Sequence, residues 1–96
     1  MNAIELIAAE RARQIEQKGY TPAHDDQHTR GELGDAAICY AWSANEQVNH
    51  RPGAEPLPSW PFADDAWQWS PDPLRNLVKA GALIVAEIER LQRRGA

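Results

Sequence analysis

The segment from Pro71 to Arg94 constrains the fold most, because its apolar residues recur at the period of an α-helix. Its stripe runs without interruption through Leu74, Leu77, Val78, Gly81, Ile84, Val85, Ile88 and Leu91. Ser70 is placed to cap this helix, and Pro71 can take the first helical position, where a missing N–H costs nothing. The sequence therefore predicts a long amphipathic helix over 71–94.

A first helix is predicted over roughly 3–18. Asn2 and Glu5 have the spacing of a capping box, and Gly19 fits the stop position. Its apolar stripe is narrow and consists of Ile4, Ile7, Ala8, Ala12 and Ile15.

A second helix is predicted over roughly 30–45. Thr29 and Glu32 again have capping-box spacing. The apolar face is rich in alanine, which suggests a close approach to a neighbouring helix, and comprises Leu33, Ala37, Tyr40, Ala41 and Ala44.

The segment between the second and third helices combines prolines with aromatic residues. Four of the seven prolines fall within 52–61, which makes regular structure unfavourable there. A disordered linker would be poor in aromatic residues, yet this segment also contains Trp60, Phe62, Trp67 and Trp69. We expect an ordered loop whose rings lie over the helices or over a partner. Exposed rings at Trp60, Trp67 and Trp69 would favour a protein partner.

These elements predict an all-α fold: a single domain over residues 1–96, built as a three-helix antiparallel bundle crossed by the Pro/Trp-rich loop. A chain of 96 residues buries only a modest share of its surface. We therefore also expect a homo-oligomer.

Charge and composition exclude several classes of protein. A net charge of −4, from 14 acidic and 10 basic residues, argues against a DNA- or RNA-binding surface. The single cysteine, Cys39, excludes an internal disulfide and fits a reducing compartment. The segment 1–14 is charged too early for a signal peptide, and the longest apolar run is too short to span a membrane. We expect a cytoplasmic protein that does not associate with membranes.

The stretch HDDQHTRGELGD, residues 24–35, concentrates candidate metal ligands. Glu32 and Asp35 are neighbours on one helical face and could hold Mg²⁺. Alternatively, Glu32 serves the cap and Asp35 complements the positive helix end. Asp25, Asp26 and His28, beside His24, could add ligands from a preceding loop, or could simply form a turn.

The first helix carries polar residues next to its apolar stripe. Glu10 and Gln14 flank the stripe, and Arg11 falls inside it, so these side chains can reach a cleft between helices. The alternatives are intrahelical pairing for Glu10 and, for Arg11, an aliphatic stem on apolar surface with its charge in water. We expect Arg13 on the opposite side of the helix.

Arg75 and Lys79 are four residues apart on the third helix, an unfavourable pair of like charges unless an anion lies opposite. A phosphate group and the acidic second helix are two candidates for that anion. A solvated helix face is the alternative.

Two segments resemble the MazG-like group of all-α nucleoside triphosphate pyrophosphatases. GELGDAA (31–37) resembles the group's acidic helix, and LVKAGALIVAEIERL (77–91) resembles a second helix of that group in its apolar pattern and its glycine. The whole chain also resembles small proteins commonly encoded by phages and prophages. The MazG-like resemblance implies helical oligomers that hydrolyse nucleoside triphosphates with Mg²⁺ held by carboxylates from two helices, with Glu32 and Asp35 as candidate ligands.

The chain departs from that pattern on the second of these helices. Where the group repeats its acidic pair, this chain has Lys79 and Ala82, neither of which can bind a metal. We therefore expect a phage-type nucleotide-binding protein that is either a MazG-like pyrophosphohydrolase or its degenerate relative, in the host cytoplasm if phage-encoded. The alternative is a non-catalytic anti-defence protein that sequesters a nucleotide signal or blocks a host defence protein.

Overall fold

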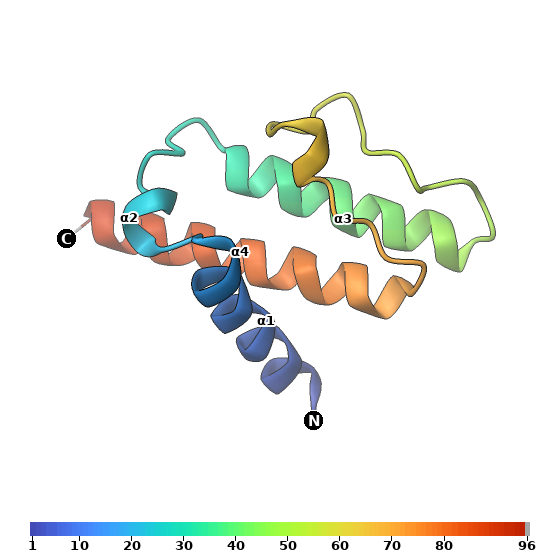
Figure 1. Cartoon of the computed structure of the whole chain (residues 1–96), viewed down its shortest axis with the longest axis horizontal. Helices are drawn as coiled ribbons and strands as arrows, with labels where there is room; N and C mark the ends of the chain where they lie inside the picture. Colours follow the sequence, from blue (N-terminus) through green and yellow to red (C-terminus); the bar gives the residue numbers. More distant parts are fainter. Residues whose placement is uncertain (96) are drawn as a thin grey trace.

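The computed structural model describes residues 1–95, and these form helices joined by loops, with no β-strand among them (Figure 1). In chain order the helices are α1 (Ala3–Lys18), α2 (Pro22–Asp25), α3 (Glu32–Val48), the 3₁₀ helix η1 (Asp64–Ala66) and α4 (Pro73–Gly95). The predicted all-α class is confirmed. Within the described part of the chain, no helix is both long enough and apolar enough to cross a bilayer.

The core lies between α3 and α4, which run side by side in opposite directions (Figure 1). Small residues line this contact, so the two helices approach closely, as the alanines of the second predicted helix suggested. The buried cluster consists of Leu33, Ala36, Ala37, Tyr40, Ala80, Leu83 and Ala86. Most of the apolar packing in the chain is therefore between these two helices.

Helix α1 does not complete a three-helix antiparallel bundle. It crosses α4 on the side away from α3, and its main helix contact is with α4 (Figure 1). The crossing point is Gly81, where an added Cβ would lie 2.7 Å from Cδ1 of Ile7. Because α1 inclines away from α3, a space over α4 remains between them.

The faces that α1 and α4 turn inward differ from the predicted stripes. On α1 the buried residues are polar, namely Glu10, Arg11 and Gln14, while Ile4 is exposed. On α4 the face toward α3 includes Leu83 and Ala86, and most of the predicted stripe points outward. Helical periodicity reports that an apolar stripe exists, but it does not report which neighbour covers it.

The helix ends are partly as predicted. Asn2 and Glu5 form the capping box of α1, and Gly19 ends it in the left-handed conformation with φ 72°. The prediction of a Thr29–Glu32 box is wrong, because Gly31 caps α3 with φ 80° and no side chain caps it.

The start of α4 also lies later than predicted. The Asp72 carboxylate accepts a hydrogen bond from the Leu74 backbone N–H at 3.0 Å, and the helix begins at Pro73. Proline thus stands at the first helical position, as predicted for such a residue, but it is Pro73 rather than Pro71. The segment predicted as a loop before α3 contains the one-turn helix α2, which Thr21 caps.

The Pro/Trp-rich loop is ordered and lies over α3, which is the first of the two predicted arrangements. Trp60, Phe62 and Trp67 pack against the core cluster. The Ser43 hydroxyl donates to the Gly53 carbonyl at 2.5 Å, and Tyr40 Oη accepts from the Gln68 backbone N–H at 2.9 Å. These bonds join both ends of the loop to α3.

Candidate functional site

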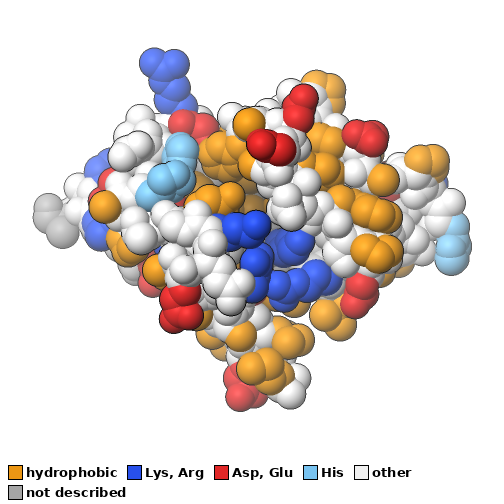
Figure 2. Space-filling view, viewed as in Figure 1, with side chains coloured by type: hydrophobic (Ala, Val, Ile, Leu, Met, Phe, Trp, Pro, Cys, Tyr) orange, Lys and Arg blue, Asp and Glu red, His pale blue; other side chains and the backbone are white. Residues whose placement is uncertain are grey.

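The space between α1 and α3 is a hollow over α4, closed on one side by the loop. Its volume is about 400 Å³ including the part open to solvent. Lys and Arg side chains gather in the middle of the face that contains it, beside an apolar depression (Figure 2). Residues from α1, α3, the loops and α4 line it: Glu10, Arg13, Gln14, Lys18, Tyr20, Ala36, Tyr40, Trp60, Phe62, Ala66, Gln68, Lys79 and Leu83.

Glu10 is the buried anchor of the cationic side of the hollow. Arg13 donates to both of its carboxylate oxygens, at 2.7 and 2.8 Å, and Arg75 of α4 donates to Oε1. Gln14 Nε2 donates to Oε2 at 3.3 Å. Burial raises the pKa of Glu10, but the hydrogen bond from Arg13 and the charge of Arg75 outweigh it, so this pKa lies below its ordinary value. Glu10 is therefore an ionised clamp that holds two arginines.

Positive charge exceeds negative charge around the hollow. Arg13, Lys18 and Lys79 line it, and Glu10 is the one acid among its lining residues. Lys79 donates to the Gln68 carbonyl and lies 5.6 Å from the centre of the Tyr40 ring. Burial and the nearby charge of Arg75 lower the pKa of Lys79. A group whose charged form is disfavoured in this way is stabilised when an anion binds beside it.

Aromatic rings form a continuous chain along the opposite wall. Tyr20 stacks on His24 with ring centres 5.6 Å apart, and His28 lies 5.1 Å from Phe62. The chain continues through edge and stacking contacts to Trp60, Trp67 and Tyr40. Burial raises the pKa of Tyr40 to about 12, so this hydroxyl is neutral at pH 7.

A second hollow of about 500 Å³ adjoins the first, with which it shares Tyr20, Phe62, Ala66 and Leu83. It is mainly apolar and aromatic, and His24, Asp25, His28 and Leu33 complete its wall. At the junction with α1, the Gln14 side chain is buried, with 4% of the residue exposed, and its Oε1 has no hydrogen-bond partner. An unpartnered buried acceptor can receive a donor from a ligand.

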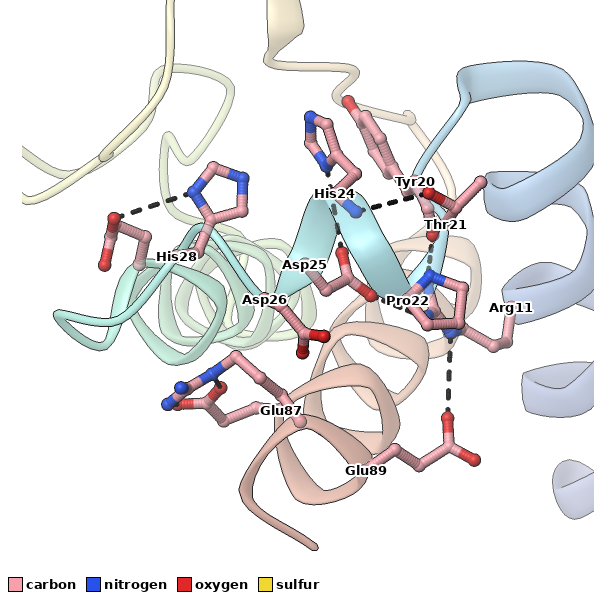
Figure 3. A network of polar contacts seen from close by, with 12 residues as sticks. Arg11, Tyr20, Thr21, Pro22, His24, Asp25, Asp26, His28, Glu87 and Glu89 are labelled. Atoms are coloured by element: carbon pink, nitrogen blue, oxygen red, sulfur yellow. Dashed lines mark hydrogen bonds and ion pairs between the residues drawn. The ribbon is translucent and has the colours of Figure 1, made fainter. Parts of the chain in front are cut away.

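Arg11 and Asp25 form a separate ion pair behind this wall (Figure 3). Arg11 Nη2 donates to Asp25 Oδ2 at 2.5 Å, and its Nη1 donates to the Tyr20 carbonyl at 3.0 Å. Both side chains are buried, and Glu89 of α4 lies at 4.0 Å from Arg11 Nε. This pair joins α1 to α2 and is balanced in charge.

The other predicted metal ligands do not converge on one site, although two of them, Glu32 and His28, are neighbours. Asp26 pairs with Arg93 at 2.7 Å, and Glu32 lies 3.6 Å from His28 Nδ1. Asp35 is half-buried on α3. Among residues 1–95 no group of three or more histidine, cysteine, aspartate or glutamate side chains is placed to hold a metal ion. Mg²⁺ at Glu32 and Asp35 stays a prediction.

The structure brings together three of the four predicted ligand-binding residues. Glu10 and Lys79 line the hollow and Arg75 donates to Glu10 beside it, whereas Arg11 lies behind it with Asp25. The prediction for Arg13 was wrong, since this residue lines the hollow rather than the opposite side. The spacing of three residues between Glu10 and Arg13 places both on one helical face, and could have indicated that Arg13 lies on the side of the hollow. No sequence pattern predicted that Tyr20 lines the hollow, because the position of this side chain depends on the turn after Gly19.

The predicted partner-binding tryptophans are all half-buried. Trp60 Nε1 donates to the Ala63 carbonyl at 3.1 Å, and Trp67 Nε1 donates to the Ala54 carbonyl at 2.8 Å. Trp69 Nε1 is buried without a partner. Two of the three rings therefore stabilise the loop itself, and a role for any of them in binding a protein stays a prediction.

No family model matches the chain, and no curated protein and no solved structure matches it. The MazG-like resemblance of 31–37 and 77–91 stays a prediction, and the chemistry of the site is argued from its own geometry.

Proposed function

We propose that the chain binds a phosphorylated small molecule, with a nucleotide as the best-fitting class, in the hollow between α1 and α3. One observation carries this proposal: a buried carboxylate is surrounded by more cations than it can neutralise, directly beside an aromatic wall. Arg13, Arg75, Lys79 and Lys18 face a single acid, Glu10. In a chain of net charge −4, such a local excess of positive charge favours the binding of an anion.

The cationic end suits phosphate oxygens. Guanidinium groups bind phosphate through planar pairs of N–H donors, and a lysine adds a point charge. Glu10 holds Arg13 and Arg75 in place before any ligand arrives, which lowers the entropy lost on binding. Their remaining N–H groups are available to a ligand.

The aromatic end suits a planar base. Tyr20, His24, His28 and Phe62 line the second hollow, and an aromatic ring stacked on a base contributes about 1–3 kcal/mol. The free Oε1 of Gln14 would accept a hydrogen bond from the ligand at the junction.

The carboxylates support binding rather than hydrolysis. Enzymes of phosphoryl transfer use carboxylates to hold Mg²⁺, but here Glu10 is occupied by two arginines and Asp25 by Arg11. Lys79 and a buried Ala82 stand where the MazG-like pattern has its second acidic pair. The proposed role is therefore that of a non-catalytic relative that sequesters a nucleotide. A protein that blocks a host defence protein stays the alternative prediction.

The test is a thermal-shift panel with nucleoside mono-, di- and triphosphates, the corresponding nucleosides and inorganic phosphate, each with and without Mg²⁺. We expect phosphorylated ligands to raise Tm, with no products detected by chromatography. Release of pyrophosphate or phosphate would show an enzyme instead. No Tm shift with any phosphorylated ligand would contradict the proposal.

Two variants with the same change in net charge locate the site. Lys79→Gln removes a cation from the hollow, and Arg30→Gln removes an exposed one from the segment before α3. We expect Lys79→Gln to weaken binding about tenfold, equivalent to ~1.4 kcal/mol, and Arg30→Gln to leave it unchanged. Equal weakening by both would indicate a diffuse charge effect rather than this site.

A further inference from the structure

The outward face of α4 is a row of exposed apolar side chains. Five residues of this row, Leu74, Leu77, Ile84, Ile88 and Leu91, are between 39% and 55% exposed. With Gly81 they follow one another in steps of three, four, three, four and three residues. This alternation is the a/d spacing of a helix seam that packs against another helix. We call these six positions the outer seam.

The middle of the outer seam is filled from within the chain. Ile7 of α1 lies against Gly81, where no side chain projects. Ile4, one turn earlier on α1, is exposed and adds to the same surface. A groove between the two helices is lined by Ile4, Ile7, Ala8, Arg11, Val85 and Glu89. The apolar surface thus continues from α4 onto the first half of α1.

The apolar area of this surface is close to the apolar share of a standard interface. At their observed exposures, Ile4 and the five large side chains of the outer seam present on the order of 500 Å². A standard interface covers about 800 Å² on each partner, of which roughly 65% is apolar in homodimers.

Charge and symmetry select a second copy of the chain as the occupant. None of the six seam positions is charged, so two identical seams meet without like-charge repulsion. A two-fold interface needs only one self-complementary surface, and the outer seam, with Ile7 of α1 filling its middle at Gly81, supplies it. We propose that two copies associate through the outer seam and the exposed half of α1.

The proposed interface lies away from the hollow. Lys79 and Leu83 line the hollow, whereas Leu77, Gly81 and Ile84 of the seam lie on other sides of the same helix. At about 100° per residue, Lys79 points roughly half a turn away from the middle of the seam. Both hollows of a dimer therefore stay open, and this proposal does not depend on the proposed function.

The test measures the molar mass of the full chain by light scattering and by sedimentation over a concentration series. We expect the wild type to be dimeric. Ile84→Glu places two charges in a two-fold interface, one from each copy, and should raise the dimer dissociation constant about a hundredfold. Because Ile84 is half-exposed, the helical circular dichroism of this variant should be unchanged.

Ile38→Glu is the matched control, since Ile38 is 58% exposed on α3, outside the seam. It should leave the dimer intact. A monomeric wild type would overturn the proposal, and so would an oligomer that Ile84→Glu and Leu77→Glu both leave intact. If Ile38→Glu dissociated the dimer as strongly as Ile84→Glu, the interface would lie elsewhere.

Discussion

Two buried carboxylates beside α1 have opposite charge balances. Asp25 pairs with one buried arginine, Arg11, and that arginine also donates to the Tyr20 carbonyl. Glu10 pairs with Arg13 and Arg75, and Lys79 and Lys18 lie around the same hollow. The first set has no excess of positive charge, since Glu89 also lies 4.0 Å from Arg11 Nε, whereas the second set is open and positive.

This difference distinguishes buried charges that stabilise the fold from buried charges that can bind a ligand. A buried pair without excess positive charge fixes two elements relative to one another and gives an anion no net charge to neutralise. An unbalanced set carries a free-energy cost that an anion relieves. Arg11 and Arg13 are two residues apart on one helix, yet they belong to these two different classes of contact.

The largest expected loss of stability comes from breaking the ion pair between Arg11 and Asp25. Asp25→Asn leaves the buried Arg11 with only the exposed Glu89, 4.0 Å from its Nε, as a counter-ion, and should lower the free energy of unfolding by about 3–5 kcal/mol. Asp26→Asn is the control on the adjacent residue. Its exposed pair with Arg93 is screened by solvent, so this variant should lose far less stability. Urea unfolding of both variants checks this, and similar losses would contradict the distinction between the two pairs.

A smaller loss of stability is expected when the contacts among Glu10, Arg13 and Arg75 are broken. Glu10→Gln removes the anion between Arg13 and Arg75, but both arginines reach solvent, so the loss should be about 1–3 kcal/mol. An added phosphate anion should restore part of it, since it replaces the lost charge. Asp25→Asn should not be restored in this way, and urea unfolding with and without inorganic triphosphate measures the difference.

The pH dependence of stability gives a further test of Glu10. Its pKa is lower in the folded chain than the ordinary value of 4.5, so the unfolded chain takes up the proton first as pH falls. Its contribution is therefore complete above pH 4.5 and is lost as pH falls through the folded pKa. Glu10→Gln should flatten the stability curve in that window. An unchanged slope would show that Glu10 is not a stabilising ionised group.

The fold could be predicted from sequence where a local rule acts alone. Asn2, Glu5 and Gly19 set both ends of α1 by capping, and the period of 71–94 predicted α4 apart from its first turn. Gly31 rather than the predicted Thr29 caps α3, because the left-handed backbone of Gly31 starts the helix without a hydrogen bond from a side chain.

The arrangement of the helices depended on long-range contacts that no local pattern encodes. The period of α4 could not reveal that Leu83 faces α3 while Ile84 faces outward. For the same reason Arg13 was placed on the wrong side of α1, although its pairing with Glu10 follows from their spacing. The meeting of Glu10 with Arg75, across 65 positions of chain, appears only once α1 crosses α4.

The most direct measurement is an NMR titration of the arginine Nη–H resonances with inorganic triphosphate, a probe without aromatic rings. We predict saturable shifts for Arg13, which lines the hollow, and for Arg75, which donates to Glu10 beside it, and little change for Arg11, whose two Nη groups already donate to Asp25 and the Tyr20 carbonyl. Absence of saturable shifts at Arg13 and Arg75, or larger shifts at Arg11, would contradict the claim that the open, positively charged set is the binding site.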